Sequence, residues 1–251
     1  MPPILYEDDD VIVVDKPAGL IVHGDGKSPE RSLADMIFDT YPSMRTVGEP
    51  MTLHGKEVLR PGIVHRLDKD TSGAMILAKH ESAFLFLKNA FQNHEVEKTY
   101  HAFLYGSMKE DKGVIEVSIG RSGGDIRRWA TGKSARGELR EAVTKFEVLY
   151  RMGVEEKKGS TEEGTYTYVV ARPKTGRTHQ LRVHFKHMNH AIVADNLYAP
   201  GKTNTLGFAR LALHARSLTL ALPSGKTVTV EAPFPADFKT AIELAEKGIP
   251  C

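Results

Sequence analysis

Short apolar runs, separated by turns rich in Gly, Pro and Asp, recur along the whole chain. Runs of this length and composition are typical of β-strands, and the close spacing of several of them indicates hairpins. The predicted strands cover residues 11–14 (continued by 20–22), 63–64, 74–78, 98–105, 114–119, 143–150, 165–171, 191–194, 211–214, 218–221 and 227–230. A polar turn over residues 155–164 joins two of them.

A smaller number of segments show helical spacing of their apolar residues. These helices are predicted over residues 33–40, 82–93, 178–188 and 236–246. Each begins beside a residue typical of a helix start: Ser32, Ser82, Thr178 and Pro235. Residues 42–60 show no period and are expected to form a long loop. We therefore predict an α+β fold with a mostly antiparallel mixed sheet flanked by helices.

Composition is compatible with a folded cytoplasmic protein. Of 251 residues, 41% are hydrophobic, which is enough for a sizeable core. The single cysteine, Cys251, excludes a disulfide framework or a cysteine metal site within one chain. No apolar run approaches the length needed to span a membrane, and the acidic N-terminus lacks a signal peptide. We expect a cytoplasmic monomer with no membrane partner.

A polar cluster, residues 65–72, stands between the apolar runs at 63–64 and 74–78. Within it Asp68 is flanked by Arg66 and Lys69. A carboxylate among cations stays ionised at neutral pH and can serve as a nucleophile or a base. The same residue types also form ordinary turns, and taken alone the cluster leaves these two interpretations even.

Residues 120–141 form the most basic segment, although the net charge of the whole chain is only +2. The only tryptophan, Trp129, lies within this segment. Cations that meet phosphate and a ring that stacks on bases are typical of a nucleic-acid surface. A solvated hairpin with a tryptophan tucked into the core fits the composition equally well.

Several ordered motifs together resemble the RluA family of RNA pseudouridine synthases. The resemblance covers nearly the whole chain and rests on His65–Asp68 with Thr71–Gly73, Lys98–Tyr100, Gly176–His184, Asp15–Leu20 with Val22–His23, Leu213–Ala215, and Ala232–Pro233. Ala194-Asp195 stands where the family pattern has Gly-Asp. The opening motif begins close to Met1, so we expect a member without the extra N-terminal RNA-binding domain.

The resemblance implies a single pseudouridine synthase catalytic domain over residues 1–251, with a central active-site cleft. The implied reaction converts uridine to pseudouridine in structured RNA, either ribosomal RNA or a tRNA stem-loop. It exchanges a C–N glycosidic bond for a C–C bond without redox change or net hydrolysis. No cofactor and no metal are therefore expected. The motifs leave the target RNA open.

The family's functional residues carry over onto matching positions. Asp68 would be the essential carboxylate, attacking the sugar, attacking the base or removing a sugar proton. Arg182 would pair with Asp68, and Tyr100 would stack on the target uracil. Arg66 would fill the gap left by a flipped base. Further RNA-contacting candidates are His65, Arg177, Arg127 and Arg128.

Two other classes of function compete with this interpretation. An RNA-binding module without chemistry would use the basic segment and would not need Asp68. A metal hydrolase is the third class, because four histidines lie close together in the sequence. They are His179, His184, His187 and His190, and two of their spacings place imidazoles on one helical face.

Overall fold

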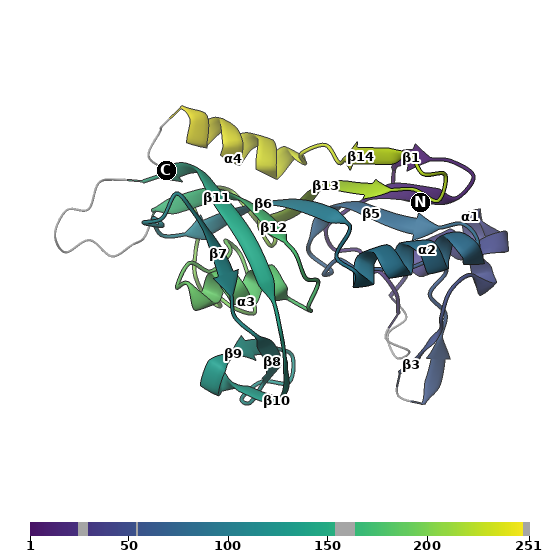
Figure 1. Ribbon diagram of the computed structural model, residues 1–251. Helices are drawn as coiled ribbons and strands as arrows, with labels where there is room; N and C mark the ends of the chain where they lie inside the picture. The colour runs from purple at the N-terminus through teal and green to yellow at the C-terminus, as the bar shows by residue number, and fades with distance from the viewer. Residues whose placement is uncertain (25–29, 54, 154–163, 248–251) are drawn as a thin grey trace. The chain divides into compact units, whose positions relative to one another are not determined.

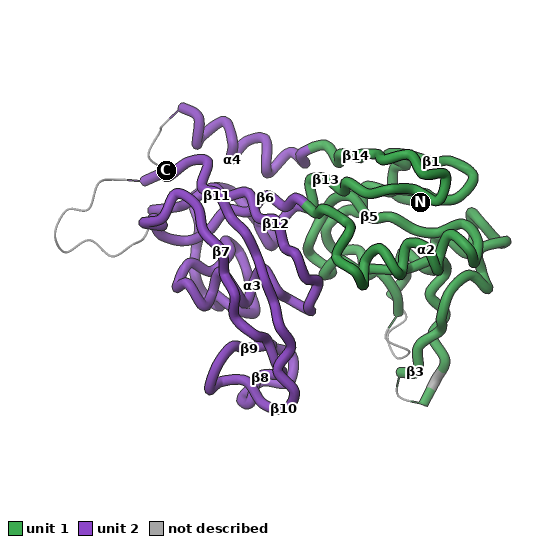
Figure 2. The backbone as a smooth tube through the Cα atoms, in the orientation of Figure 1, with its two compact units in different colours: residues 1–98, 215–233 green, residues 99–214, 234–251 purple. Residues whose placement is uncertain are grey.

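The computed structural model describes residues 1–24, 30–53, 55–153 and 164–247 (Figure 1). Almost all of the expected turn over residues 155–164 lies outside the described residues. Helices and mostly antiparallel strands make up the fold, which confirms the predicted α+β class. The chain divides into two compact units (Figure 2). Unit 1 comprises Met1–Lys98 and Ala215–Pro233, and unit 2 comprises Thr99–His214 and Phe234–Cys251.

Unit 1 is built on a buried sheet. Its strands are β1 (Ile4–Glu7), β2 (Val11–Lys16), β5 (Ser72–Ala78), the greater part of β13 (Leu213–Ala221) and β14 (Thr227–Glu231). Strand β2 pairs antiparallel with β5, from Val11 opposite Ala78 to Lys16 opposite Gly73. Every residue of β5 is buried, which explains its continuous apolar sequence. The polar cluster at 65–71 therefore leads directly into a rigid strand.

The helices of unit 1 begin for different reasons. In α1 (Leu33–Thr40), Ser32 and Asp35 form a reciprocal capping box, as its N-cap position predicted. Helix α2 (Glu81–Gln92) begins one residue earlier than expected, and Ser82 is not its cap. His80 takes that role, because Asp10 holds its Nε2 and Nδ1 accepts the amide of Ala83.

Three further predictions for unit 1 were wrong. Residues 20–22 do not extend β2; the carbonyls of Ile21 and Val22 instead accept the first amides of α1. Residues 63–64 are not a strand, since Ile63 makes only an isolated bridge to Leu77. The expected loop over 42–60 contains a 3₁₀ turn and a hairpin. These elements are η1 (Pro42–Thr46), β3 (Met51–Leu53) and β4 (Lys56–Val58).

Unit 2 contains a second antiparallel ladder and a small satellite sheet. The ladder runs β6, β12, β11, β7, with bounds Glu97–Tyr105, Tyr166–Pro173, Val143–Met152 and Lys112–Glu116. The satellite sheet comprises β8 (Ile119–Ser122), β9 (Trp129–Thr131) and β10 (Ala135–Arg140), with the turn η2 (Gly132–Ser134). The single strand expected over 114–119 is therefore two strands, β7 and β8. Residues 191–194 form only a bridge, at Ile192, and the two strands expected over 211–221 are the single strand β13.

Aromatic rings form the centre of the core of unit 2. Phe103 stacks on Tyr168 with centroids 4.5 Å apart, and Phe208 meets Phe238 edge to face at 5.2 Å. Phe238 comes from α4 (Ala236–Glu246), which begins after Pro235 as predicted. None of the described helices is long and apolar enough to cross a bilayer.

Helix α3 (Gln180–His187) begins later than predicted. Its N-cap is His179, whose φ of 56° lies in the left-handed region, and no side chain caps the helix. Thr178 was therefore wrong as a cap. The Gln180 side chain turns back toward the preceding segment, where its Oε1 accepts from Thr175 and from the amide of Arg177. This arrangement fixes the tight entry into α3.

Candidate active site

The loop that carries Asp68 is held by a buried lysine at the end of β2. Lys16 is fully buried, and its ammonium donates to the carbonyls of Pro17, Leu20 and Lys69 at 2.9, 2.8 and 3.0 Å. The amide of Gly19 donates to the same Lys69 carbonyl at 2.9 Å. The Lys16 ammonium thus holds together the turn after β2 and the backbone of Lys69, the residue after Asp68.

His65 fixes the other side of the loop. Its ring stacks on Phe91 with centroids 4.5 Å apart, and its Nε2 accepts the amide of Ile76 at 3.1 Å. Burial, together with the charge of Lys98, holds the pKa of His65 well below its usual range. His65 is consequently neutral, and the structure gives it an anchoring role beside any contact with RNA.

Between these two anchors, Asp68 is half-buried while Asp70 is exposed. The Asp68 carbonyl accepts the amide of Thr71 at 3.1 Å, which closes a turn, and the neighbouring Leu67 is buried. Arg66 is exposed, and its Nη1 lies 3.1 Å from the Nε2 of His23. A half-buried carboxylate beside an exposed cation fits the predicted division of roles between these two residues.

Gly73 is the exit from this loop, and no other residue fits there. Its φ is 119°, a conformation that disfavours side chains. A Cβ atom at this position would lie 2.1 Å from the carbonyl oxygen of Ala215 in the neighbouring strand. The motif's glycine is therefore explained by close packing of two backbones.

In unit 2, Arg182 is held by a buried carboxylate that sequence reasoning missed. Its Nε and one terminal nitrogen donate to the two oxygens of Asp195 at 2.7 and 2.8 Å. The Asp195 side chain is fully buried and also accepts the amides of Leu197 and Tyr198. A bidentate pair fixes the plane of the guanidinium. The Asp195 position was noticed in the sequence only as part of a Gly-Asp pattern.

Tyr198 links Arg182 to the satellite sheet. The guanidinium carbon of Arg182 lies 5.0 Å from the centre of the Tyr198 ring. Its hydroxyl contacts the Nδ1 of His179 at 2.9 Å and accepts the amide of Trp129 at 2.9 Å. Trp129 is half-buried, with Arg121 over its ring at 4.6 Å. The basic segment and α3 are thus parts of one hydrogen-bonded network.

The remaining predicted residues of unit 2 occupy three different settings. Tyr100 is half-buried on β6 opposite Ala171. Arg177 donates from Nε to the carbonyl of Glu141 at 3.0 Å. Arg127 and Arg128 both lie against Asp125, and the hydrogen bonds from Arg127 lower the pKa of that carboxyl to about 2. Their roles toward RNA stay predictions.

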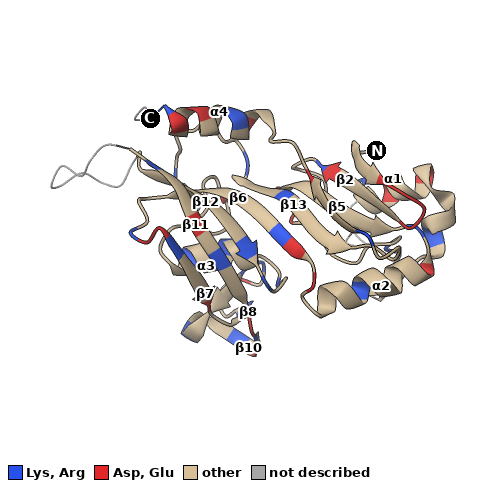
Figure 3. Cartoon of the chain, turned by 45° about the horizontal axis from the view of Figure 1, so that its top comes forward, with Lys and Arg blue, Asp and Glu red and all other residues tan. Residues whose placement is uncertain are grey.

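Lys and Arg residues are visible on α3 and β10 of unit 2 (Figure 3). Helix α3 contains Arg182 and Lys186, and β10 contains Arg136 and Arg140; only β10 belongs to the basic segment over residues 120–141 that the sequence singled out. Asp68, Arg66 and His65 lie in unit 1, whereas Tyr100 and Arg182 lie in unit 2. The convergence of these residues stays a prediction.

The four clustered histidines do not point at a common centre. His184 is fully buried between the Thr144 hydroxyl and the Val117 carbonyl. The other three contact Tyr198, Thr131 and the Tyr105 carbonyl respectively. Across the ranges that the structure describes, no group of three or more potential ligands could hold a metal ion. The spacing of these histidines therefore gives no support to a metal hydrolase.

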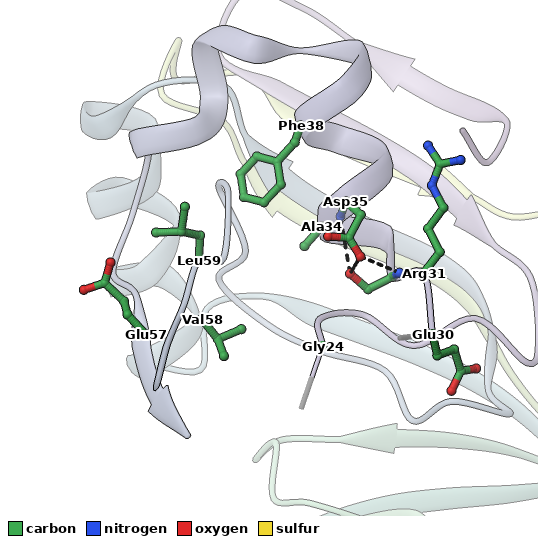
Figure 4. Close-up of a pocket in the computed structure, with 10 residues that line it drawn as sticks. Gly24, Glu30, Arg31, Ala34, Asp35, Phe38, Glu57, Val58 and Leu59 are labelled. Atoms are coloured by element: carbon green, nitrogen blue, oxygen red, sulfur yellow. Dashed lines mark hydrogen bonds between the residues drawn. The ribbon is translucent and has the colours of Figure 1, made fainter. Parts of the chain in front are cut away.

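A surface pocket of about 600 Å³ lies beside α1 in unit 1 (Figure 4). None of the predicted site residues lines it, and its acidic members do not favour RNA. The Asp35 carboxylate inside it is occupied by the cap of α1. Its lining residues are Gly24, Glu30, Arg31, Ser32, Ala34, Asp35, Phe38, Glu57, Val58 and Leu59.

Comparison with protein families decides the relationship that the motifs suggested. A family model described as RNA pseudouridylate synthase matches residues 10–187, which include the loop of Asp68, the Tyr100 strand and all of α3. The chain belongs to the RNA pseudouridine synthases. The predicted resemblance to the RluA family is thereby confirmed. The chain is accordingly a member of an isomerase family that acts on RNA.

Individual relatives agree with this assignment. An uncharacterized RNA pseudouridine synthase of Synechocystis is 38% identical over 98% of this chain and 70% of its own length. A ribosomal large subunit pseudouridine synthase D of Xanthomonas campestris is 35% identical over 94% of this chain and 67% of its own length. The solved human RNA pseudouridylate synthase domain containing 1 has a TM-score of 0.70 at 26% identity, covering 94% of this chain and 87% of that one.

Proposed function

We propose that this RNA pseudouridine synthase isomerises specific uridines in structured RNA, with large-subunit ribosomal RNA as the first substrate to test. The observation that carries the proposal is the doubly anchored loop that holds Asp68 half-buried between Lys16 and His65. Holding a reactive group on rigid elements is what an active site requires. The relatives named as ribosomal large subunit pseudouridine synthases support the choice of RNA.

In this proposal the uracil leaves its ribose, rotates and rejoins through carbon. Asp68 acts on the sugar or on the base, as nucleophile or as base. Arg182 keeps Asp68 ionised and aimed, while Asp195 fixes the guanidinium. The target base is flipped out of the RNA, Tyr100 stacks on it, and the exposed Arg66 fills the gap.

Asp68→Asn tests the central claim, and Asp70→Asn is the matched control. Both variants remove one carboxylate charge from the same loop, but only Asp68 is half-buried. We expect Asp68→Asn to lose activity by a factor of about 10³ or more, since removing an essential reacting group typically has this effect. Asp70→Asn should retain most of the wild-type rate.

The assay is tritium release from an unmodified large-subunit ribosomal RNA transcript that contains [5-³H]uridine, followed by mapping of carbodiimide adducts. Filter binding of the same RNA should be nearly equal for all three proteins. Wild-type turnover by Asp68→Asn would contradict the assignment of the carboxylate. RNA binding without any tritium release by the wild type would favour an RNA-binding module for this substrate.

A second prediction concerns the Arg182–Asp195 pair. Arg182→Ala should lose activity, and Asp195→Asn should lower the rate about 10-fold or more while Arg182 is still present. The reason is that the amide supplies only one acceptor oxygen where the guanidinium needs two in a fixed plane. The measurement is the rate of tritium release at saturating RNA. Equal rates in Asp195→Asn and the wild type would show that the orientation of Arg182 is set elsewhere.

A further inference from the structure

Lys98 in unit 1 is a buried cation with no compensating partner. It is the second residue of β6 and is only 7% exposed. Within the part of the chain that the structure describes, its ammonium forms neither a hydrogen bond nor an ion pair with the protein, and its nitrogen is not fully enclosed, since it is not among the completely buried atoms that lack a partner. Burial alone lowers its pKa to about 8. Desolvating a charge without a partner is costly, so a buried lysine of this kind calls for an explanation.

Lys16 shows what a satisfied buried lysine looks like in the same unit. Its ammonium has three carbonyl acceptors, each within 3.0 Å. Lys98 has none of these contacts, although both residues adjoin the loop of Asp68: Lys16 binds the Lys69 carbonyl, and Lys98 acts electrostatically on His65. The contrast indicates that the donors of Lys98 serve a group that the protein itself does not supply.

The position of Lys98 on β6 identifies the neighbourhood that it serves. Alternate side chains of a strand point to the same face, so Lys98 and Tyr100 share one face of β6, about 7 Å apart along the strand. Tyr100 is the residue assigned to the target uracil in the proposed function. Lys98 therefore has the reactive loop on one side and the uracil's stacking partner next to it on its own strand.

We propose that Lys98 contacts the target uracil and stabilises the negative charge that the base acquires during the reaction. The inference rests on the proposed function and deepens it. In each of the three routes open to Asp68, electrons move onto the base. When the glycosidic bond breaks, its electron pair leaves with N1 and spreads onto O2 and O4. When Asp68 attacks the ring instead, the pair moves toward O4.

The charge is returned when the new bond forms. The uracil donates the pair from C5 to the sugar carbon, C5 then loses its proton to solvent, and N1 takes up one proton. Asp68 is regenerated in each route: its bond to the sugar or to the ring breaks and its electron pair returns to the carboxylate, or it gives the removed proton back to the sugar. Atoms and charge balance without a cofactor, and Lys98 needs only to donate hydrogen bonds. A preorganised ammonium in a desolvated site is worth far more than one in water, because no solvent screens the developing charge.

Phosphate is the alternative ligand for such a cation, and kinetics separate the two. A phosphate is charged before, during and after the reaction, so a phosphate contact strengthens binding of the RNA throughout. A uracil is neutral in bound RNA and anionic only during the reaction. A lysine that serves the uracil therefore raises the rate at saturation and leaves the affinity for RNA almost unchanged.

The test compares Lys98→Met with wild type and with Lys112→Met, a change of an exposed lysine on β7. Methionine keeps the length and removes the charge. We expect tritium release at saturating ribosomal RNA transcript to fall about 100-fold or more, with the filter-binding affinity within about 2-fold of wild type. The urea midpoint of Lys98→Met should be equal to or higher than that of wild type, because an uncompensated charge is removed.

A wild type that releases no tritium overturns the proposed function and this inference with it. An active wild type with an equally active Lys98→Met overturns the inference alone. Weaker RNA binding with an unchanged saturated rate identifies a phosphate contact and also overturns it. If Lys98→Met does not fold, Lys98→Gln replaces it. Failure of both to fold assigns Lys98 a structural role and contradicts the inference.

Discussion

At Ala194 the chain carries a side chain where its backbone favours none. Its φ is 55°, in the left-handed region, where a Cβ atom meets the following carbonyl oxygen. Glycine avoids that contact, which gives a physical reason for the Gly-Asp pattern from which this chain departs. The next residue, Asp195, holds Arg182, so the backbone here must keep this conformation. The strain therefore lies one residue before the carboxylate that orients a proposed site residue.

Ala194→Gly should therefore stabilise the protein. Relief of the left-handed conformation is worth about 1–2 kcal/mol, and the greater flexibility of glycine in the unfolded chain offsets part of it. We expect a net gain of about 0.5–1 kcal/mol in the free energy of unfolding, measured by urea titration. The control is Ala236→Gly in α4, where the backbone is helical and the same change should lose stability. A loss at both positions would show that Ala194 is not strained.

At the scale of elements, the sequence predicted a helix or strand correctly wherever neighbouring residues supply the cap or the burial that the element needs. Helix α1 was predictable because Ser32 and Asp35 form its cap from neighbouring positions. Strand β5 was predictable because it is buried along its whole length. Predictions failed where a distant group intervened: Asp10 makes His80 the cap of α2, and residues 20–22 give their carbonyls to α1.

The candidate site divides in the same way. The loop of Asp68 was predictable because its polar residues are contiguous and ordered within one motif. Its supports were not, since Lys16 binds the Lys69 carbonyl 53 positions away in the sequence, and Asp195 binds Arg182 from 13 positions away, beyond the end of α3. No periodicity or spacing distinguishes a lysine that binds carbonyls, such as Lys16, from one without a partner, such as Lys98.

The junction between β2 and the loop of Asp68 gives an element-scale prediction. Lys16→Met leaves the carbonyls of Pro17 and Leu20 buried without this donor, so we expect a loss of about 3 kcal/mol or more in unfolding free energy. Activity should fall further than stability explains, because the Lys69 carbonyl next to Asp68 is released. Urea unfolding and tritium release at a temperature where both proteins are folded measure the two effects.

The control for this change is Lys69→Met, judged by stability alone. Lys69 forms an ion pair with Glu30 at 2.7 Å, but both side chains are largely exposed. Such pairs are worth no more than about 1 kcal/mol, so this variant should unfold close to wild type. Similar losses in both lysine variants would argue that Lys16 is not the specific clamp of the loop.

At the scale of the whole molecule, stability must depend on pH through two neighbouring groups of unit 1. The pKa of Lys98 falls from 10.5 to about 8 on folding, so below pH 8 the folded state carries a charged, uncompensated lysine. That cost is about 3 kcal/mol and is released as pH rises from 8 to 10.5, where the unfolded chain still binds the proton. The pKa of His65 is also lowered on folding. The protein therefore loses stability as pH falls below about 6.5, because there the unfolded chain protonates His65 and the folded chain does not.

The difference in unfolding free energy between Lys98→Met and wild type isolates these terms, because all other groups are shared. Between pH 6.5 and 8 the difference should be constant and in favour of the variant. It should shrink by about 3 kcal/mol as pH rises to 10.5, since the wild-type lysine becomes neutral. It should grow below pH 6.5, because removing the charge of Lys98 lets His65 accept a proton more easily.

Urea titrations at pH 5, 7 and 10.5 measure all three regimes, with Lys112→Met as the control that shows no such trend. A difference that does not change with pH would mean that folding leaves the pKa of Lys98 at its ordinary value, so that the cation beside the loop of Asp68 is present but compensated or solvated.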